Sequence, residues 1–386
     1  MIKTDVCIIG AGPSGASTSL TLSKMKIPHY IIDKSTFPRN KTCGDGLILY
    51  AYKALRLIDE GLFDKFLNHP KFIHSKNIKL HVNNNVDINF KESKDRNMVI
   101  TYAKRFDFDD FLVKNISDKY ASFDFGNGVK NITELKDGVL IKLKDGKEVL
   151  SKIVIGADGV NSIVSRKLAG NKLQKNLTST FVNGYFKNVT NLSKTNEAEI
   201  RIIYKKIPLF FYIFPLSDGS VNISLGGNAK LILKHNINLI EQVESIIKNH
   251  PKVAYKFTNA IKIDSWRGWS IPYNFGKNKV YGNRFMLVGD AAGLTNPFYK
   301  EGVGTGMMSG IICAKSIEAS LKNNDYSEDF LSTYSKNLKS EFGRLLKFSR
   351  LMLKATEFKF LFGSITYLLK NRIQTKATKI IKRKSY

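Results

Sequence analysis

The alternation of apolar and polar residues near the N-terminus predicts a strand–helix–strand unit. Residues 4–9 form a short apolar run that ends at glycine, which is typical of a buried parallel strand. A helical stretch follows the glycines and continues to about Lys26, and a second strand over residues 29–32 ends at Asp33. The first turn of this unit reads Gly-Ala-Gly-Pro-Ser-Gly over residues 10–15.

Each part of this unit has a physical reason to bind a dinucleotide. Gly10 permits a tight turn, Gly12 lets the backbone approach a pyrophosphate, and Gly15 allows the helix to pack closely on the strand. The free N–H groups at the helix start hold phosphates. Asp33 can accept hydrogen bonds from ribose hydroxyls. The alternative is a glycine turn in an α/β protein that binds nothing.

Further motifs follow along the chain in a regular order. Residues 41–46 read KTCGDG, and residues 104–108 read KRFDF ahead of a helix that includes Phe111 and Leu112. Residues 153–166 run from a strand into Ala-Asp-Gly and a helix start. Residues 285–310 have a similar arrangement: a strand ends at Gly-Asp, and a glycine-rich helix follows a loop that contains proline.

With these motifs the sequence resembles the FAD-dependent oxidoreductases of the p-hydroxybenzoate hydroxylase fold, and among them the geranylgeranyl reductase family. The resemblance covers about residues 1–310. It implies that FAD is the cofactor, that Asp290 reaches its ribityl or ribose hydroxyls, and that a helix start near Gly302 and Val303 faces the flavin; a helix N-cap without a ligand is the alternative for Asp290. The cofactor-binding residues that it implies are Gly10, Gly12, Pro13, Ser14, Gly15, Asp33, Lys34, Lys41, Cys43, Gly44, Arg105, Asp158, Gly289, Asp290, Gly302 and Val303.

The same resemblance implies an α/β fold in which a Rossmann-like FAD-binding domain carries an inserted α+β substrate domain and a C-terminal helical segment. We expect residues 1–74, 100–175 and 273–330 to form the FAD-binding domain. Residues 75–99 and 176–272 are expected to form the substrate domain, with residues 331–386 as the C-terminal helical region. The alternating pattern of residues 77–90 predicts strands of the substrate-domain sheet.

An aromatic segment is the candidate wall of the substrate site. Period-two alternation places Phe210, Tyr212 and Phe214, which precede Pro215, on one face of a strand. The family resemblance favours a cavity wall beside the flavin, whereas the spacing alone also describes an ordinary sandwich strand. Trp269 and Tyr299 complete the predicted substrate-binding set.

Lys300 stands where the family has glycine. Its side chain either alters the flavin and substrate site or points to solvent, and the sequence does not decide between these alternatives.

Cys43 is the candidate catalytic residue, since the resemblance places it near the reactive face of the flavin. A small residue required by a tight loop is the alternative. Hydride delivery from reduced flavin to a C=C bond needs position and a dry apolar site, followed by a proton from Cys43, a tyrosine or water. The resemblance therefore implies an FAD-dependent reductase of an isoprenoid or other lipid-like substrate. A monooxygenase or halogenase that acts on an aromatic or acyl substrate is the alternative, and NAD(P)H and ferredoxin both stay open as electron donors.

Composition narrows the remaining choices. Three cysteines in 386 residues exclude a disulfide scaffold, and no Cys/His cluster offers a metal site. The N-terminus lacks the features of a signal peptide and no apolar run is long enough to span a bilayer, so we expect a cytoplasmic protein. The excess of 61 Lys+Arg over 33 Asp+Glu, a net charge of +28, fits acidic ligands, an anionic membrane or a lysine-rich organism. No nucleic-acid motif is present.

The C-terminal region is rich in both apolar and basic residues. Residues 331–386 read as helical, and the chain ends close to a Lys-Arg-Lys cluster. Basic residues beside an amphipathic surface suit peripheral binding to an anionic membrane at the inner face. The alternative is a helical cap over the substrate tunnel with a solvated charged tail. The oligomeric state stays open.

Overall fold

The first forty residues form the predicted strand–helix–strand unit in the computed structural model, which describes residues 1–82, 86–91 and 99–368. Strand β1 (Ile2–Ile9) leads through the glycine turn into helix α1 (Pro13–Lys24), and strand β2 (His29–Asp33) follows. Proline at the first position suits the helix start, because its fixed φ is already helical and its missing N–H would have no partner there.

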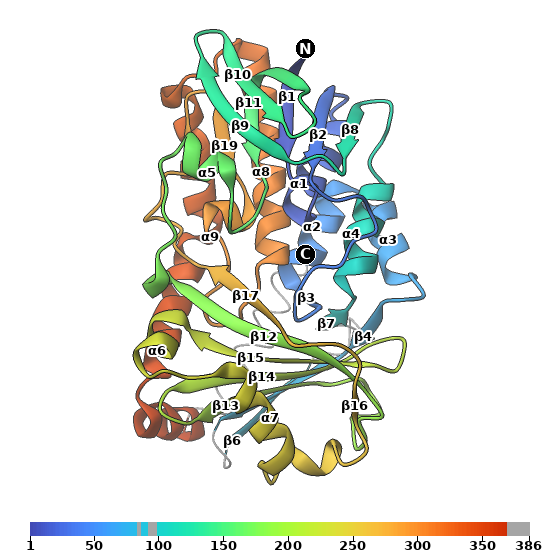
Figure 1. Ribbon diagram of the computed structural model, residues 1–386, viewed down its shortest axis with the longest axis vertical. Helices are drawn as coiled ribbons and strands as arrows, with labels where there is room; N and C mark the ends of the chain where they lie inside the picture. The colour runs from blue at the N-terminus through green and yellow to red at the C-terminus, as the bar shows by residue number, and fades with distance from the viewer. Residues whose placement is uncertain (83–85, 92–98, 369–386) are drawn as a thin grey trace.

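The sheet that contains this unit occupies the upper half of Figure 1. Its strand order is β18-β19-β11-β1-β2-β8, with the β9–β10 hairpin attached to β11. The pairs β19–β11, β11–β1, β1–β2 and β2–β8 are parallel, as expected of a Rossmann-like sheet. The added strands are β8 (Ala121–Phe125), β9 (Val129–Leu135), β10 (Gly138–Leu143), β11 (Glu148–Gly156), β18 (Tyr281–Gly282) and β19 (Phe285–Leu287).

A second, largely antiparallel sheet lies below the first (Figure 1). Its order is β16-β12-β15-β14-β13-β5-β6, and β17 also pairs with β12. The strands are β5 (Asn77–Val82), β6 (Val86–Lys91), β12 (Thr178–Lys187), β13 (Ala198–Tyr204), β14 (Pro208–Pro215), β15 (Val221–Asn228), β16 (Ile261–Lys262) and β17 (Arg267–Pro272). The predicted strands over 77–90 are therefore β5 and β6, although residues 83–85 lie outside the described part of the chain.

Helices cover the sheets, and a small sheet lies between them. The small sheet has the order β3-β7-β4, from Gly46–Ile48, Ile100–Tyr102 and Ile73–Ser75. The helices are α2 (Leu49–Ile58), α3 (Glu60–Leu67), α4 (Arg105–Lys114), α5 (Ile163–Lys167), α6 (Ala229–Lys234), α7 (Leu239–Asn249), α8 (Val303–Asn323) and α9 (Glu328–Ala355). Short 3₁₀ turns occupy Lys175–Leu177, Ala254–Lys256 and Gly289–Ala292, and residues 359–368 are helical.

Helix α8 packs directly against α1 because small residues line the contact. A Cβ on Gly306 or Gly310 of α8 would collide with Ser14 and Ser17 of α1. The Ser17 hydroxyl donates a 2.8 Å hydrogen bond to the carbonyl of Met307 on α8. This contact holds the loop before α8 beside the glycine turn before α1, although the two lie almost 300 residues apart in sequence.

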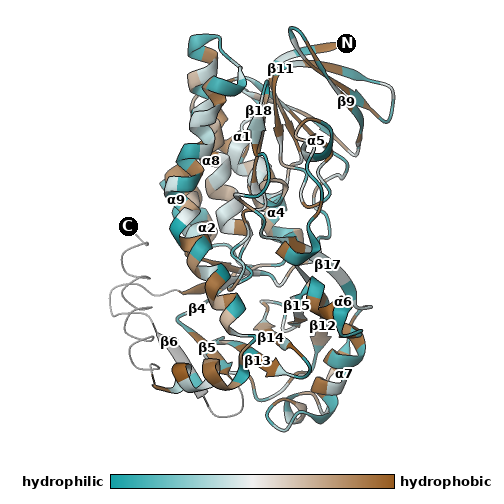
Figure 2. Cartoon of the chain, turned by 90° about the vertical axis from the view of Figure 1, so that its left-hand side faces the viewer, coloured by the Kyte–Doolittle hydropathy of each residue, from teal (hydrophilic) through white to brown (hydrophobic). Residues whose placement is uncertain are grey.

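Helix α9 joins the two halves of the molecule. Phe342 and Leu346 belong to the core of the upper half, and Leu353 belongs to the apolar cluster beside the second sheet. Figure 2 shows α9 running beside α8 down to the level of β13. The fold is the α/β architecture that the sequence predicts. The two sheets fall on either side of the predicted domain boundaries, which stay a prediction.

Candidate functional site

The glycine turn after β1 leaves an open cradle. Gly10 has a φ of +102°, and a Cβ there would collide with the backbone of Ala157. Gly12 differs, because a Cβ there would meet only the end of the Arg39 side chain, at 3.4 Å. Both glycines line a large cavity. The backbone at Gly12 is thus bare towards the cavity, as close approach of a pyrophosphate requires.

Asp33 closes the base of this turn. Its Oδ2 accepts a 2.7 Å hydrogen bond from the backbone N–H of Ala11, and its Oδ1 accepts from Ser35. The carboxylate is buried and lies in the cavity wall at the end of β2. This is the position from which the sequence predicts contact with a ribose.

The cavity extends from the glycine turn to the second sheet and has a volume of about 1240 Å³. That exceeds the usual 300–1,000 Å³ of a small-molecule pocket, so there is room for more than one ligand. Most residues predicted from the sequence line it: Gly10, Gly12, Pro13, Ser14, Asp33, Lys34, Lys41, Cys43, Gly44, Arg105, Asp158, Phe210, Tyr212, Phe214, Trp269, Asp290, Tyr299, Gly302 and Val303.

Three predicted residues do not line the cavity. Gly15 lies against the Gly10 carbonyl, and Gly289 lies against Ser14, so both serve close packing. Pro215 is the last residue of β14 and pairs with Val221 of β15. At these two glycines, neighbouring protein atoms occupy the space that a side chain would take. The spacing of glycines in the sequence does not distinguish this packing requirement from the close approach of a ligand.

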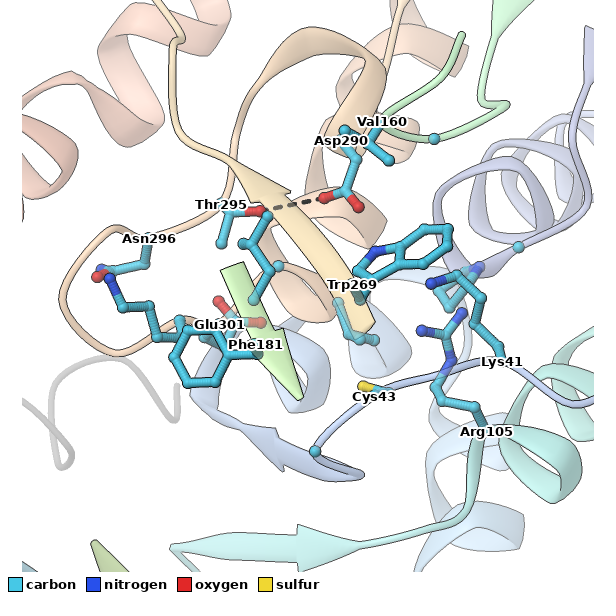
Figure 3. Close-up of a pocket in the computed structure, with 18 of the residues that line it drawn as sticks. Lys41, Cys43, Arg105, Val160, Phe181, Trp269, Asp290, Thr295, Asn296 and Glu301 are labelled. Atoms are coloured by element: carbon cyan, nitrogen blue, oxygen red, sulfur yellow. Dashed lines mark hydrogen bonds between the residues drawn. The ribbon is translucent and has the colours of Figure 1, made fainter. Parts of the chain in front are cut away.

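Cationic side chains, among them Lys41 and Arg105, gather in one part of the cavity wall (Figure 3). The Lys41 ammonium lies 3.1 Å from the centre of the Trp269 ring, a cation–π contact. Burial and the neighbouring Arg105 lower the pKa of Lys41 to about 7, although Asp290 and Cys43 act in the opposite direction. The Cys43 side chain lies in the same part of the cavity, in the loop that also carries Lys41 (Figure 3).

Arg105 is held by a buried carboxylate. Its Nε and Nη2 donate to the two oxygens of Asp109 at 2.6 and 2.8 Å, and Asp109 is fully buried. Arg39 reaches the same carboxylate at 3.0 Å. Burial alone would lower the pKa of Arg105, but Asp109 outweighs it and the pKa is raised. The sequence predicts Arg105 as a cofactor residue, and only the fold shows that Asp109 joins it to Arg39.

A polar network under the Cys43 loop is also missing from the sequence prediction. Asp45 is fully buried and accepts 2.7 Å hydrogen bonds from the Tyr185 hydroxyl and the Asn222 amide. The same Asn222 amide donates to the carbonyl of Cys43 at 2.8 Å. Burial raises the pKa of Asp45 to about 6, against the effect of these hydrogen bonds. The network connects the loop to β12 and β15 and so positions Cys43.

Asp290 lies deep in the cavity wall. Its Oδ1 accepts a 3.1 Å hydrogen bond from the Thr295 hydroxyl, drawn as a dashed line in Figure 3. The residue makes no side-chain capping bond to its short helix, so its contacts do not match the alternative of a helix cap. Burial raises the pKa of Asp290, and Lys41, Thr295 and Arg105 oppose this rise.

The loop before α8 brings two further ionisable groups to the site. Helix α8 begins at Val303 after Gly302, as predicted, and the Glu301 carboxylate accepts the N–H of Gly304 in its first turn. Burial raises the pKa of Glu301 to about 7. Lys300 has a φ of +58°, a conformation that favours glycine, and its side chain lines the cavity rather than pointing to solvent.

The far part of the cavity is an apolar chamber. Phe210, Tyr212 and Phe214 share one face of β14 and line it, while Phe211 and Ile213 belong to the core on the other face. Residues from the small sheet, the second sheet and the C-terminal helices complete the wall: Ile78, Leu80, Val99, Ile100, Phe181, Ile200, Ile271, Phe298, Leu345, Phe348, Met352, Phe362 and Ile365.

Comparison with known proteins gives consistent matches. A family described as FAD binding domain matches residues 3–349. A digeranylgeranylglycerophospholipid reductase of Methanococcus vannielii is 26% identical over 351 residues, covering 89% of this chain and 84% of that protein. A menaquinone reductase of Mycobacterium tuberculosis is 27% identical over 334 residues, covering 82% and 77%.

A solved structure shares the fold over the whole chain. A geranylgeranyl bacteriochlorophyll reductase-like protein from Thermoplasma acidophilum superposes with a TM-score of 0.81 at 21% identity, covering 100% of this chain and 92% of that one.

Proposed function

The chain belongs to the FAD-binding domain family, and on this premise we propose that it reduces C=C bonds of an isoprenoid or other lipid-like substrate. It is an FAD-dependent oxidoreductase of the geranylgeranyl reductase type. The observation that carries the proposal is the single cavity that joins the glycine cradle at Gly12 to the aromatic chamber at Phe210.

The residues present fit FAD. The bare backbone at Gly12 would receive the pyrophosphate, and Asp33 stands at the strand end where a ribose is expected. Asp290 and the helix start at Val303 would hold the ribityl chain and the ring system. When bound, reduced flavin supplies a hydride for transfer to carbon.

The chamber supports an apolar substrate. Its walls are mainly aromatic and aliphatic, which suits hydride transfer to a C=C bond because that step needs an apolar site. We propose that Cys43 gives the proton that completes the reduction, because the network around Asp45 fixes the loop that carries it. The electron donor, NAD(P)H or ferredoxin, is a separate question that the binding of either to the purified protein would answer.

Anaerobic turnover tests this function. The FAD-loaded protein is reduced with dithionite, mixed with geranylgeraniol, and followed by flavin absorbance and product mass. Flavin reoxidation with a mass gain of about two daltons per reduced bond is the expected result. Turnover that needs oxygen, or that incorporates bromide when bromide is added, would instead favour the monooxygenase or halogenase alternative.

We also propose that the C-terminal helices dock on an anionic membrane beside the cavity. Phe360, Leu361 and Leu368 are 84%, 60% and 77% exposed, while Phe362 on the opposite face lines the chamber. Exposed lysines accompany the apolar side chains at 347, 354 and 359. Apolar side chains with basic neighbours are typical of helices that lie in a membrane interface. The basic residues 369–386, on which part of the prediction rests, lie outside the described chain.

No helix in the described ranges is both long and apolar enough to cross a bilayer. Cosedimentation with vesicles of phosphatidylglycerol, compared with phosphatidylcholine, tests the docking. Leu361→Asp should reduce binding to the anionic vesicles, whereas Leu135→Asp on the β9 strand, an equally apolar exposed site far from the chamber, should not. Equal binding by both variants would count against the proposal.

A further inference from the structure

Lys300 places a positive group in the largely apolar wall of the chamber. Its ammonium donates to the Ser179 hydroxyl at 2.9 Å and to the Pro297 carbonyl. The aromatic rings of Phe210 and Tyr273 lie 5.1 and 5.6 Å from the same nitrogen. Within the described ranges it forms no ion pair with a carboxylate, so no protein anion balances its charge.

The third N–H of this ammonium has no acceptor among the described residues. Ammonium has three donors, and only two of them are used by Ser179 and Pro297. Lys300 also lines the cavity, together with Phe210 and Phe298. A ligand that occupies the chamber therefore meets a buried donor with spare capacity and no counter-charge.

The backbone conformation at Lys300 is unusual for a residue that has a side chain. Lys300 has a φ of +58°, which a residue with a Cβ adopts at a cost and glycine adopts freely. Strained residues of this kind cluster at functional sites. An ammonium buried without an anion is a second cost at the same residue.

We propose that Lys300 binds an anionic oxygen group of the substrate, a carboxylate or a phosphate, and so selects acidic lipid-like molecules for this chamber. This inference rests on the proposed function, because it names the substrate class of the same cavity. The ammonium would pair with the anion through its free N–H while Ser179 and Pro297 hold it in place. The apolar chain of the substrate would then lie against the face of β14 that carries Phe210 and Tyr212.

Protonation gives the interaction a recognisable pH dependence. Burial lowers the pKa of Lys300 to about 7. A bound anion favours the charged amine, so affinity for the anion should fall as the pH rises above 7 and the free amine loses its proton. Around the amine, Ser179, Phe210 and Pro297 do not titrate, and Tyr273 has a pKa raised to about 12. The neighbouring Glu301 titrates near 7 but its carboxylate is turned to the start of α8.

Equilibrium binding to the oxidised FAD-loaded protein tests the proposal. The probes are geranylgeranoic acid, geranylgeranyl monophosphate and geranylgeraniol, titrated at pH 6 to 9 and followed by the flavin absorbance spectrum. A hydrogen bond to a charged partner corresponds to about a 10- to 100-fold gain in affinity, so at pH 6 at least one anionic probe should bind that much more tightly than the alcohol. Whether the acid or the phosphate gains more identifies the anion.

Lys300→Gly is the matched variant, because glycine suits the positive φ and removes the amine together with its side chain. It should lose the preference for the anion and its fall above pH 7, and Lys300→Arg should keep the preference. Because Glu301 and Lys41 are unchanged in Lys300→Gly, the difference between the two titrations isolates Lys300. Equal affinity of the wild-type protein for acid, phosphate and alcohol would overturn the proposal, as would an anion preference that survives in Lys300→Gly.

Failure of this inference is separable from failure of the reductase function. Anaerobic reduction of neutral geranylgeraniol tests the latter without using the amine. Turnover of the alcohol by a protein that shows no preference for anions would leave the function in place and remove the role of Lys300. Anion-selective binding without any reduction would do the reverse.

Discussion

Substitution of Gly12 should weaken cofactor binding without preventing folding, so the two effects can be measured separately. Its φ of −66° is open to any residue, and an added Cβ meets only the flexible end of Arg39. Gly12→Ala and Gly12→Val should therefore fold, with a free energy of unfolding of the apoprotein within about 1 kcal/mol of wild type. The new side chain would instead fill the space in which the pyrophosphate is expected.

The expected loss of affinity follows from that overlap. Forcing one or more extra carbon atoms into a close contact costs about 1–3 kcal/mol, which corresponds to about a 5- to 150-fold weaker binding of FAD, with valine at the upper end. The assay is reconstitution of apoprotein with FAD, followed by flavin fluorescence quenching. Thermal unfolding is measured on the apoproteins, because bound FAD would itself raise the melting temperature.

Gly10 is the matched control. It has a φ of +102°, and a Cβ there would collide with the backbone of Ala157. Gly10→Ala should therefore destabilise the apoprotein itself, by about 3 kcal/mol or more. A folded Gly12→Val protein that binds FAD as tightly as wild type would refute the placement of the dinucleotide and, with it, the assignment of every cofactor residue.

Three further predictions concern buried charge. Arg105→Met leaves the buried Asp109 carboxylate with Arg39 as its partner and should cost about 1.5–3 kcal/mol of stability in urea unfolding, while unchanged stability would show that the bidentate pair does not stabilise the fold. Lys256→Met removes the 2.6 Å partner of buried Glu199 in the second sheet and leaves Arg201 at 3.3 Å, and it should lower stability by a similar amount without changing the FAD affinity of the folded protein. The pKa of Asp45 is raised from 3.8 to about 6, so folding binds a proton and stability should fall by about 2 kcal/mol as the pH rises from 4 to 6; Asp45→Asn should lack this fall in pH-dependent unfolding.

The nucleotide half of the site was predictable because its parts are local in sequence. A strand, a glycine turn, a helix and Asp33 lie within one short segment, and periodicity identifies each of them. The two faces of β14 were also predictable from the alternation of its residues, since Phe210 and Phe214 lie on the cavity face while Phe211 lies on the core face. In both cases the repeat of the secondary structure determines which side chains face the cavity, and that repeat can be read from a short stretch of sequence.

What could not be predicted depends on contacts between distant segments. Asp45 is surrounded by Tyr185 and Asn222, about 140 and 177 residues away, and nothing near it in sequence indicates a buried carboxylate. In the same way Arg39, from the loop after β2, pairs with Asp109 of α4.

Lys300 shows how such a contact changes an interpretation. In the sequence, Lys300 replaces a glycine of the family pattern, and its side chain could equally well point into the site or into solvent. In the structure β12 supplies Ser179 and β14 supplies Phe210, so the amine is enclosed by the wall of the chamber. A departure from a family pattern therefore gains a chemical meaning only when the fold shows what surrounds it. Here the surroundings are neutral, which is why the missing charge is sought on the substrate.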